Sequence, residues 1–399
     1  MPKQIRFVIR TAIILLTSPP FYAIMKPKGG VKVDYLQKLK YHFRPKRGWV
    51  NDPNGLIYFK GYYHLFYQHA PDYEIPWHQP MHWGHARTKD FINWEELPVA
   101  LYPDTDYDSN GCWSGTAIEK DGVLYLFYAS IRTPKGSSEK IQTVSVAYSK
   151  DGVEFEKYSG NPVIDHYPAD GGPDFRDPAV CLIDGNYYCV MASGNPESRT
   201  GRLLLYRSTD LFNWEYVGIM SEWAGCKYAE CPSLVSMKEG YLLTASVCPF
   251  DKRHYFTVMY GRFEGGIFHI EDQAEIDRGP DQYAGQVFRD HLGRSILISW
   301  IPGWKYKGYA EKDVGCFSVP REITVTDGRI CAYPIAELRH LLTDEDPALR
   351  RTENGFVIER EGRDPVIYEG KINDLKILRD GYIIEVFLNG GEDNFTALL

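Results

Sequence analysis

The sequence predicts an all-β fold, and three observations lead to this prediction. Aromatic residues make up 14% of the 399 residues, and side chains of this kind favour pleated strands. Short apolar runs alternate with turns, and the chain holds 36 glycines and 25 prolines to form them. No amphipathic pattern of ordinary helix length interrupts these runs.

Five segments repeat one pattern, in which an apolar strand, a tight glycine turn and a second apolar strand follow one another. The turns lie at Gly61, Gly122, Gly185, Gly240 and Gly293, roughly 50 to 65 residues apart. A second hairpin follows the first at 85–95, 146–156 and 205–215. Four strands in each of five units predict a five-bladed β-propeller over residues 41–335, preceded by a tail and lead-in at residues 1–40.

Charge and cysteine content narrow the classes of partner and compartment. The formal net charge of −8 argues against a nucleic-acid partner, because such binders usually carry a basic face. The eight cysteines show no CxxC spacing, which favours reduced, buried thiols and a cytoplasmic location. The apolar run 12–16 is too short to span a membrane and resembles at most a weak secretory signal, so secretion stays the alternative, and Met25 could be the true start.

An acidic residue stands near the start of the first strand in three of the five units. Asp52 and Asp177 each precede a proline, and Glu230 lies two residues before one. Acidic residues beside proline are common in turns, but turn chemistry explains poorly why three units repeat them. Because the first strand of a propeller blade lines the central channel, we expect the three carboxylates to be in register and to converge on one pocket.

Converging carboxylates on an aromatic-rich scaffold suggest glycoside hydrolysis, in which one acid is ionised and a second is protonated. Asp52 follows the amide side chain of Asn51 and is expected to stay ionised. Glu230 has apolar neighbours and is expected to carry the proton. Arg176 is expected to keep the adjacent Asp177 as a carboxylate that holds substrate hydroxyls.

Three motifs resemble those of glycoside hydrolase family 32, the beta-fructofuranosidases, which includes invertases, inulinases, levanases and sucrose-6-phosphate hydrolases. They are WVNDPNG at 49–55, FRDP at 175–178 and ECP at 230–232. The resemblance implies that Asp52 is the nucleophile, Glu230 the general acid/base and Asp177 the stabiliser of the transition state. It further implies a retaining hydrolase that releases fructose from sucrose or beta-fructans through a covalent fructosyl-enzyme intermediate.

The same resemblance implies a set of residues that bind a small sugar such as sucrose or a fructo-oligosaccharide. These are Asn51, Gln68, Trp77, Trp113, Ser114, Arg176, Tyr283 and Trp300. Trp77 and Trp113 could equally belong to the propeller core, and Gln68 could cap a strand. His64, His69, His78, His82 and His85 do not form a tight ligand cluster, and the resemblance implies neither a metal nor a cofactor.

The chain departs from the family after the propeller. Residues 336–399 resemble the last strands of the family's β-sandwich, so we expect a shortened sandwich-like module. With few strands to close a core, it should pack on the propeller or on another copy of the chain, which would make a homo-oligomer.

Other readings of the substrate stay open beside the leading one. Lys305 and Lys307 could meet a phosphate, which keeps sucrose-6-phosphate hydrolysis as an alternative, and a fructosyltransferase would share the same intermediate. A five-bladed arabinanase-like or xylosidase-like enzyme and a non-catalytic sugar-binding propeller are weaker alternatives.

Overall fold

The computed structural model describes residues 39–72, 80–302 and 315–399, and strands dominate them. The first two four-stranded sheets run in chain order. They contain β1 (Trp49–Phe59), β2 (Tyr62–Ala70), β3 (His82–Thr88) and β4 (Trp94–Leu101), then β5 (Gly111–Lys120), β6 (Val123–Arg132), β7 (Ile141–Ser149) and β8 (Glu156–Lys157). Every pairing within these sheets is antiparallel, as hairpins joined by short turns require.

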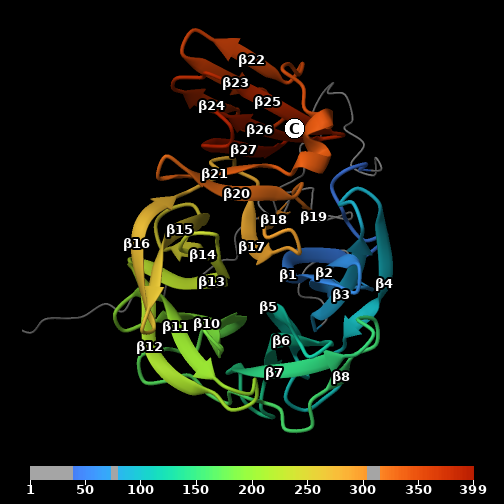
Figure 1. Ribbon diagram of the computed structural model, residues 1–399, viewed down its shortest axis with the longest axis vertical. Helices are drawn as coiled ribbons and strands as arrows, with labels where there is room; N and C mark the ends of the chain where they lie inside the picture. Colours follow the sequence, from blue (N-terminus) through green and yellow to red (C-terminus); the bar gives the residue numbers. More distant parts are fainter. Residues whose placement is uncertain (1–38, 73–79, 303–314) are drawn as a thin grey trace, which may run out of the picture. The chain divides into compact units, whose positions relative to one another are not determined.

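Three further sheets follow the same plan. They contain β9 (Phe175–Ile183), β10 (Asn186–Asn195), β11 (Thr200–Ser208) and β12 (Glu215–Ala224); β13 (Cys226–Ser236), β14 (Tyr241–Pro249), β15 (Tyr255–Glu264) and β16 (Ile267–Ala274); and β17 (Tyr283–Arg289), β18 (Ser295–Ile301), β20 (Arg321–Thr326) and β21 (Arg329–Pro334), with the short β19 (Cys316–Phe317) beside β18. Each first strand contacts the first strand of the next sheet, and β17 contacts β1. The five sheets therefore close a ring with their first strands innermost (Figure 1).

A bulge interrupts every innermost strand at a corresponding place. The register shifts fall between Val50 and Pro53, Cys112 and Gly115, Arg176 and Ala179, Glu230 and Ser233, and Tyr283 and Gln286. In three of them a residue other than glycine takes a positive φ, which is 58° at Asp177, 46° at Cys231 and 50° at Ala284. Because a bulge bends a strand and re-aims its side chains, these five positions can turn polar groups toward the ring centre.

Apolar side chains fill the spaces between neighbouring sheets. Phe66 and Trp83 of the first sheet, for example, pack against Leu126 of the second and are fully buried. The last space, between the fifth and first sheets, also receives Leu378 and Phe387 from the C-terminal module. The module therefore covers the place where the ring closes.

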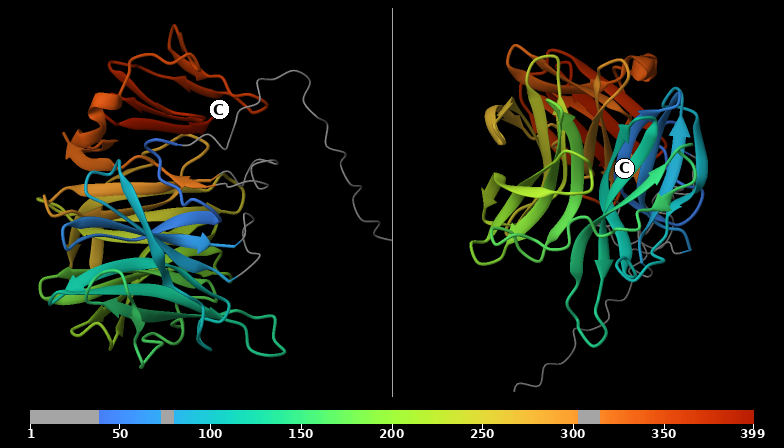
Figure 2. Two further views of the ribbon diagram at one scale, coloured as in Figure 1. Left: turned by 90° about the vertical axis from the view of Figure 1, so that its right-hand side faces the viewer. Right: turned by 60° about the horizontal axis from the view of Figure 1, so that its bottom comes forward.

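The module consists of two three-stranded antiparallel sheets that follow the 3₁₀ helix η1 (Ala336–Leu341). The strands are β22 (Leu349–Thr352), β23 (Gly355–Ile358), β24 (Val366–Glu369), β25 (Leu375–Asp380), β26 (Ile383–Leu388) and β27 (Asp393–Leu398). The two sheets share an apolar core around Phe356 and Val386. The sequence had suggested that the module has too few strands to close a core of its own. The module also lies beside the fifth blade (Figure 2), as expected, whereas pairing between two copies of the chain stays a prediction.

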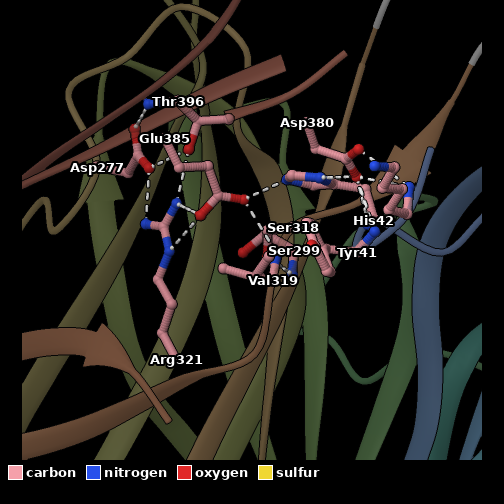
Figure 3. Close-up of polar contacts among 11 residues, drawn as sticks. Tyr41, His42, Asp277, Ser299, Ser318, Val319, Arg321, Asp380, Glu385 and Thr396 are labelled. Atoms are coloured by element: carbon pink, nitrogen blue, oxygen red, sulfur yellow. Dashed lines mark hydrogen bonds and ion pairs between the residues drawn. The ribbon is translucent and has the colours of Figure 1, made fainter. Parts of the chain in front are cut away.

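A buried charged network ties the module to the propeller (Figure 3). Arg321 of β20 donates to Asp277 at 2.7 Å and to Glu385 of β26 at 2.8 Å. Glu385 also accepts from the backbone N–H of Val319 and pairs with His42 Nε2, each at 2.9 Å. Each buried charge thus has an opposite charge within hydrogen-bonding distance, which is the condition for burying it at all.

The residues before the first strand join the same network. Asp380 pairs with His42 Nδ1 at 3.0 Å and accepts the backbone N–H groups of Lys40, Tyr41 and His42. Burial alone would lower the pKa of His42, but its hydrogen bonds with Asp380 and Glu385 raise it to about 9. His42 is therefore a cation at neutral pH, and it holds the lead-in segment on the module.

Candidate active site

A pocket of about 330 Å³ opens near the N-terminal ends of the innermost strands. It is lined by Asn51, Asp52, Gln68, Trp113, Ser114, Lys140, Gln142, Asp174, Arg176, Asp177, Tyr228 and Glu230. The structure thus brings the three sequence-predicted acids to one cavity. Elsewhere the innermost strands line a second cavity, whose wall includes Leu56, Val180 and Leu234 but none of the three acids.

Each acid has its own set of hydrogen-bond partners. Asp52 accepts the hydroxyl of Ser114 at 2.6 Å, and Asp177 accepts the backbone N–H of Cys231 at 2.9 Å. Glu230 accepts Arg176 Nη2 on Oε1 at 3.0 Å and the hydroxyl of Tyr283 on Oε2 at 2.6 Å. Among these hydrogen bonds, only one to Glu230 comes from a cationic donor, the Arg176 guanidinium, and such an ion pair stabilises the ionised carboxylate most.

The three acids are not in register, contrary to expectation. Glu230 stands just before the bulge of its strand, whereas Asp177 is the first residue within its own bulge. Arg176, Glu230 and Tyr283 occupy corresponding positions in three successive blades, which explains why they contact one another. The acids still reach one pocket. Glu230 faces the pocket from the position before its bulge, and the bulge in the neighbouring strand turns Asp177 toward the same pocket.

The distribution of protons also differs from the sequence-based expectation. Burial raises the pKa of Asp177 to about 7 against the opposing effect of Arg176, and burial likewise raises the pKa of Asp52. Burial would also raise the pKa of Glu230, but Arg176 and Tyr283 lower it below its usual value. The reason is that Arg176 donates to Glu230 and to Asp174 at 2.7 Å and makes no hydrogen bond to Asp177 among the described contacts. Glu230 is therefore more readily ionised than Asp177 in the free molecule.

The predicted sugar-binding residues fall into three groups. Asn51, Gln68, Trp113, Ser114 and Arg176 line the pocket. Tyr283 and Trp300 do not line it: Tyr283 bonds Glu230, and the Trp300 ring packs edge-on against Trp49. Trp77 and His78 lie outside the described residues, as do Lys305 and Lys307.

Some pocket residues were missed from the sequence. Asp174 bonds Arg176, and the Arg176 guanidinium stacks on the Tyr228 ring at 4.4 Å. Asp174 and Tyr228 stand two residues before Arg176 and Glu230, so the two-residue period of a strand could have found them. Lys140 and Gln142 come from the turn and strand after β6, and no motif marks them.

Two of the histidines considered as metal ligands, His64 and His85, pair inside the first blade. His64 Nδ1 lies 2.9 Å from His85 Nε2, and both rings are buried beside Phe66. Burial lowers the pKa of His64 to about 4, so the pair is neutral at pH 7. Within residues 39–72, 80–302 and 315–399, no three His, Cys, Asp or Glu side chains are grouped to hold a metal ion.

Comparison with known proteins decides the family. The family profile described as the glycosyl hydrolases family 32 N-terminal domain matches residues 42–334. The chain belongs to glycoside hydrolase family 32. This confirms the resemblance drawn from the three motifs.

Named relatives of the family 32 chain are sugar hydrolases. It is 36% identical over 327 residues to a sucrose-6-phosphate hydrolase of Zymomonas mobilis, covering 76% of this chain and 63% of that protein. It is 36% identical over 317 residues to a raffinose invertase of Escherichia coli, covering 75% and 65%. The chain thus spans somewhat less than two thirds of the length of these relatives.

Solved structures agree on the fold of the family 32 chain. A Bombyx mori GH32 beta-fructofuranosidase superposes with a TM-score of 0.79 at 28% identity, covering 91% of this chain and 89% of that one. A sucrose-6-phosphate hydrolase of Lactobacillus gasseri superposes with a TM-score of 0.81 at 24% identity, covering 92% and 89%, which shows the fold alone. The predicted five-bladed propeller with a shortened sandwich-like module is confirmed. Among the described residues, no helix has the length and apolar character needed to cross a membrane.

Proposed function

We propose that this chain is a retaining glycoside hydrolase that releases fructose from sucrose or beta-fructans. The observation that carries the proposal is the placement of Asp52 and Glu230 on separate blades around one pocket, each with its own donors. The names of the relatives support it, since they include sucrose-6-phosphate hydrolases, a raffinose invertase and a levanase. A related structure was determined with sucrose bound.

In the proposed reaction Asp52 is the nucleophile. Its carboxylate attacks C2 of the fructosyl unit while Glu230 donates a proton to the departing glycosidic oxygen, so that the C2–O bond breaks as an ester to Asp52 forms. Glu230 then removes a proton from water, the water oxygen bonds to C2, and the ester to Asp52 breaks to release fructose. Such a retaining course requires the two carboxyl groups to lie about 5–5.5 Å apart.

The surroundings of each acid suit these roles. The Ser114 hydroxyl bonds one oxygen of Asp52 and fixes its orientation for attack. Asp177, held by the backbone of Cys231, is proposed to bind ring hydroxyls and stabilise the transition state. Arg176 lies between Glu230 and Asp174 at the pocket wall, where it can hold the leaving sugar.

Glu230 must receive a proton before it can act as an acid. Below pH 7 Asp177 holds one, because its pKa is about 7, and the three acids are close enough to titrate as one set. A bound sugar removes water from Glu230, and this desolvation moves the shared proton toward it. As the pH rises through about 7, the free enzyme therefore loses the proton that Glu230 needs to act as the acid.

Replacing Asp52 by asparagine tests the proposal. We expect the wild-type chain to release fructose from sucrose and Asp52→Asn to lose at least roughly a thousandfold in kcat, since the nucleophile is gone. The control is Glu119→Gln, which removes an acid from the other end of an innermost strand and should leave activity unchanged. A wild-type chain that binds sucrose but releases no fructose would support a sugar-binding propeller instead.

A panel of substrates separates the finer alternatives. The Lys140 ammonium lies 4.9 Å above the Trp113 ring at the pocket wall, where it could meet a phosphate on the leaving sugar. A kcat/KM for sucrose 6-phosphate well above those for sucrose, inulin and levan would favour a phosphosugar hydrolase. Products larger than the substrate would favour a fructosyltransferase, and hydrolysis of arabinan without fructose release would refute the family 32 activity.

The compartment also belongs to the proposal. All eight cysteines are free thiols, and seven of them are buried. This supports operation in a reducing environment and hence the cytoplasmic expectation.

A further inference from the structure

Cys248 is a buried thiol that the proposed reaction does not use. Its Sγ lies 3.2 Å from Glu230 Oε2 and 2.8 Å from the Tyr283 hydroxyl. The Tyr283 hydroxyl in turn lies 2.6 Å from the same Oε2. Two side chains, from β14 and β17, therefore contact a single carboxylate oxygen of Glu230 on β13.

The backbone places Cys248 at this spot. Cys248 is paired with Tyr228 across β13 and β14, and Glu230 lies two residues further along β13 on the same face. Other described thiols lie further from a carboxylate: Cys231 is 3.7 Å from Asp177, and Cys112 is 3.7 Å from Asp108. The contact of Cys248 with Glu230 thus follows from strand pairing next to the site.

The two oxygens of Glu230 have different surroundings. Oε1 faces Arg176, which lines the pocket. Oε2 faces Tyr283 and Cys248, neither of which lines the pocket. Oε1 therefore lies on the side of the pocket, and Oε2 lies on the side where Tyr283 and Cys248 hold the carboxyl group.

The direction of the hydrogen bonds follows from the charges. Burial raises the pKa of Cys248, so the thiol is neutral and carries one proton to donate. Glu230 is ionised and can only accept, so Tyr283 donates to it. The thiol then donates to the Tyr283 oxygen or to Oε2, and a chain of donors of this kind strengthens each member.

We propose that Cys248 is a positioning residue for Glu230, which rests on the proposed function. Through Tyr283 and Oε2 it fixes the carboxyl group so that Oε1 faces the glycosidic oxygen, and it sets the proton affinity of the acid. Loss of the thiol loosens Glu230 and removes a donor that favours its ionised form. Both effects act on proton transfer and neither acts on the attack by Asp52.

Cys248→Ala tests this role against two leaving groups. We expect a two- to tenfold lower kcat on sucrose, the range of one hydrogen bond, and little change on a nitrophenyl fructoside, whose leaving group needs no proton. The alkaline limb of kcat/KM for sucrose should move to higher pH, since a lost donor favours the protonated form of Glu230 within the set of three acids that titrate together. Cys248→Ser restores a donor, so the alkaline limb of its kcat/KM should lie at the same pH as in the wild type or at a lower pH.

Cys189→Ala is the matched control, because Cys189 is also fully buried on a blade strand but packs in an apolar core. Its melting temperature should fall about as far as that of Cys248→Ala, with no change in pH profile or leaving-group dependence. If Cys248→Ala does not fold, Cys248→Ser carries the test alone. An alkaline limb of kcat/KM at higher pH than in the wild type would then refute the inference. Equal losses on both substrates without a shifted limb would also refute it, while the proposed function would stand. No fructose release by the wild type would refute the proposed function itself.

Discussion

Replacing His42 by glutamine should remove a contribution to the free energy of unfolding, and this contribution changes with pH. His42 lies between Asp380 and Glu385 and is completely buried, with both ring nitrogens engaged. Glutamine keeps a hydrogen-bonding group of similar reach but carries no charge at any pH. Asp380 then loses its cationic partner, and of its cationic partners Glu385 keeps only Arg321.

The magnitude follows from the pKa of His42, which is about 9 in the folded chain against an ordinary value of 6.5. This difference corresponds to roughly 3 kcal/mol of folding free energy. Because the folded pKa is the higher one, the contribution is fully present below pH 6.5 and is lost as the pH rises through 9. The free-energy gap between wild type and His42→Gln should therefore narrow by about 3 kcal/mol over this window.

Urea unfolding followed by tryptophan fluorescence measures this gap, since the chain has nine tryptophans. The free energy of unfolding is measured at pH 6, 7.5 and 9.5, which covers the range between the two pKa values of His42. Subtracting the values of the two proteins removes the contributions of all groups that titrate alike in both. His64→Gln is the control, because His64 is neutral throughout with a pKa of about 4. Parallel stability curves for wild type and His42→Gln from pH 6 to 9.5 would show that His42 is not charged in the network.

Two further substitutions probe the site and the ring. Ser114→Ala removes the 2.6 Å bond to Asp52, and because this bond lowers the pKa of that carboxyl, the acidic limb of kcat/KM should move to higher pH. Ser130→Ala, in a separate hydroxyl cluster, should leave the limb in place. An unmoved limb in Ser114→Ala would argue against Asp52 as the group that must ionise. Gly115→Ala places a methyl group into the carbonyl oxygen of Phe127 and should lower stability by about 1–3 kcal/mol or more in thermal melting. Gly122→Ala meets no neighbour, so its cost should be limited to the roughly 1 kcal/mol of an alanine at a φ of 77°, and a Gly115→Ala loss no larger than that of Gly122→Ala would contradict the steric reason.

Much of the fold could be predicted because it repeats. Hairpins at Gly61, Gly122, Gly185, Gly240 and Gly293 follow from short apolar runs and glycine turns, which are local signals. The bulges could not be predicted, since a shift in pairing depends on the partner strand and not on one residue. Asp177 and Glu230 therefore appeared to be in register in the sequence but differ by one position in the structure.

The members of the candidate site could be predicted better than their charges. Asp52, Asp177 and Glu230 stand out by their neighbours in the sequence, whereas the pKa of each depends on a donor from another blade. Arg176 illustrates this point: it is adjacent to Asp177 in the chain but bonds Glu230, 54 residues away. Cys248 carries no signal at all, because its role arises only where β14 passes behind Glu230.

The seam between the fifth and first blades is filled by residues from the part of the chain that is synthesised last. Leu378 and Phe387 fill this seam, and Asp380 anchors the backbone of residues 40–42. These groups leave the ribosome after all five blades have been made. The apolar packing of this seam and the anchoring of residues 40–42 are therefore complete only once β25 and β26 have been synthesised.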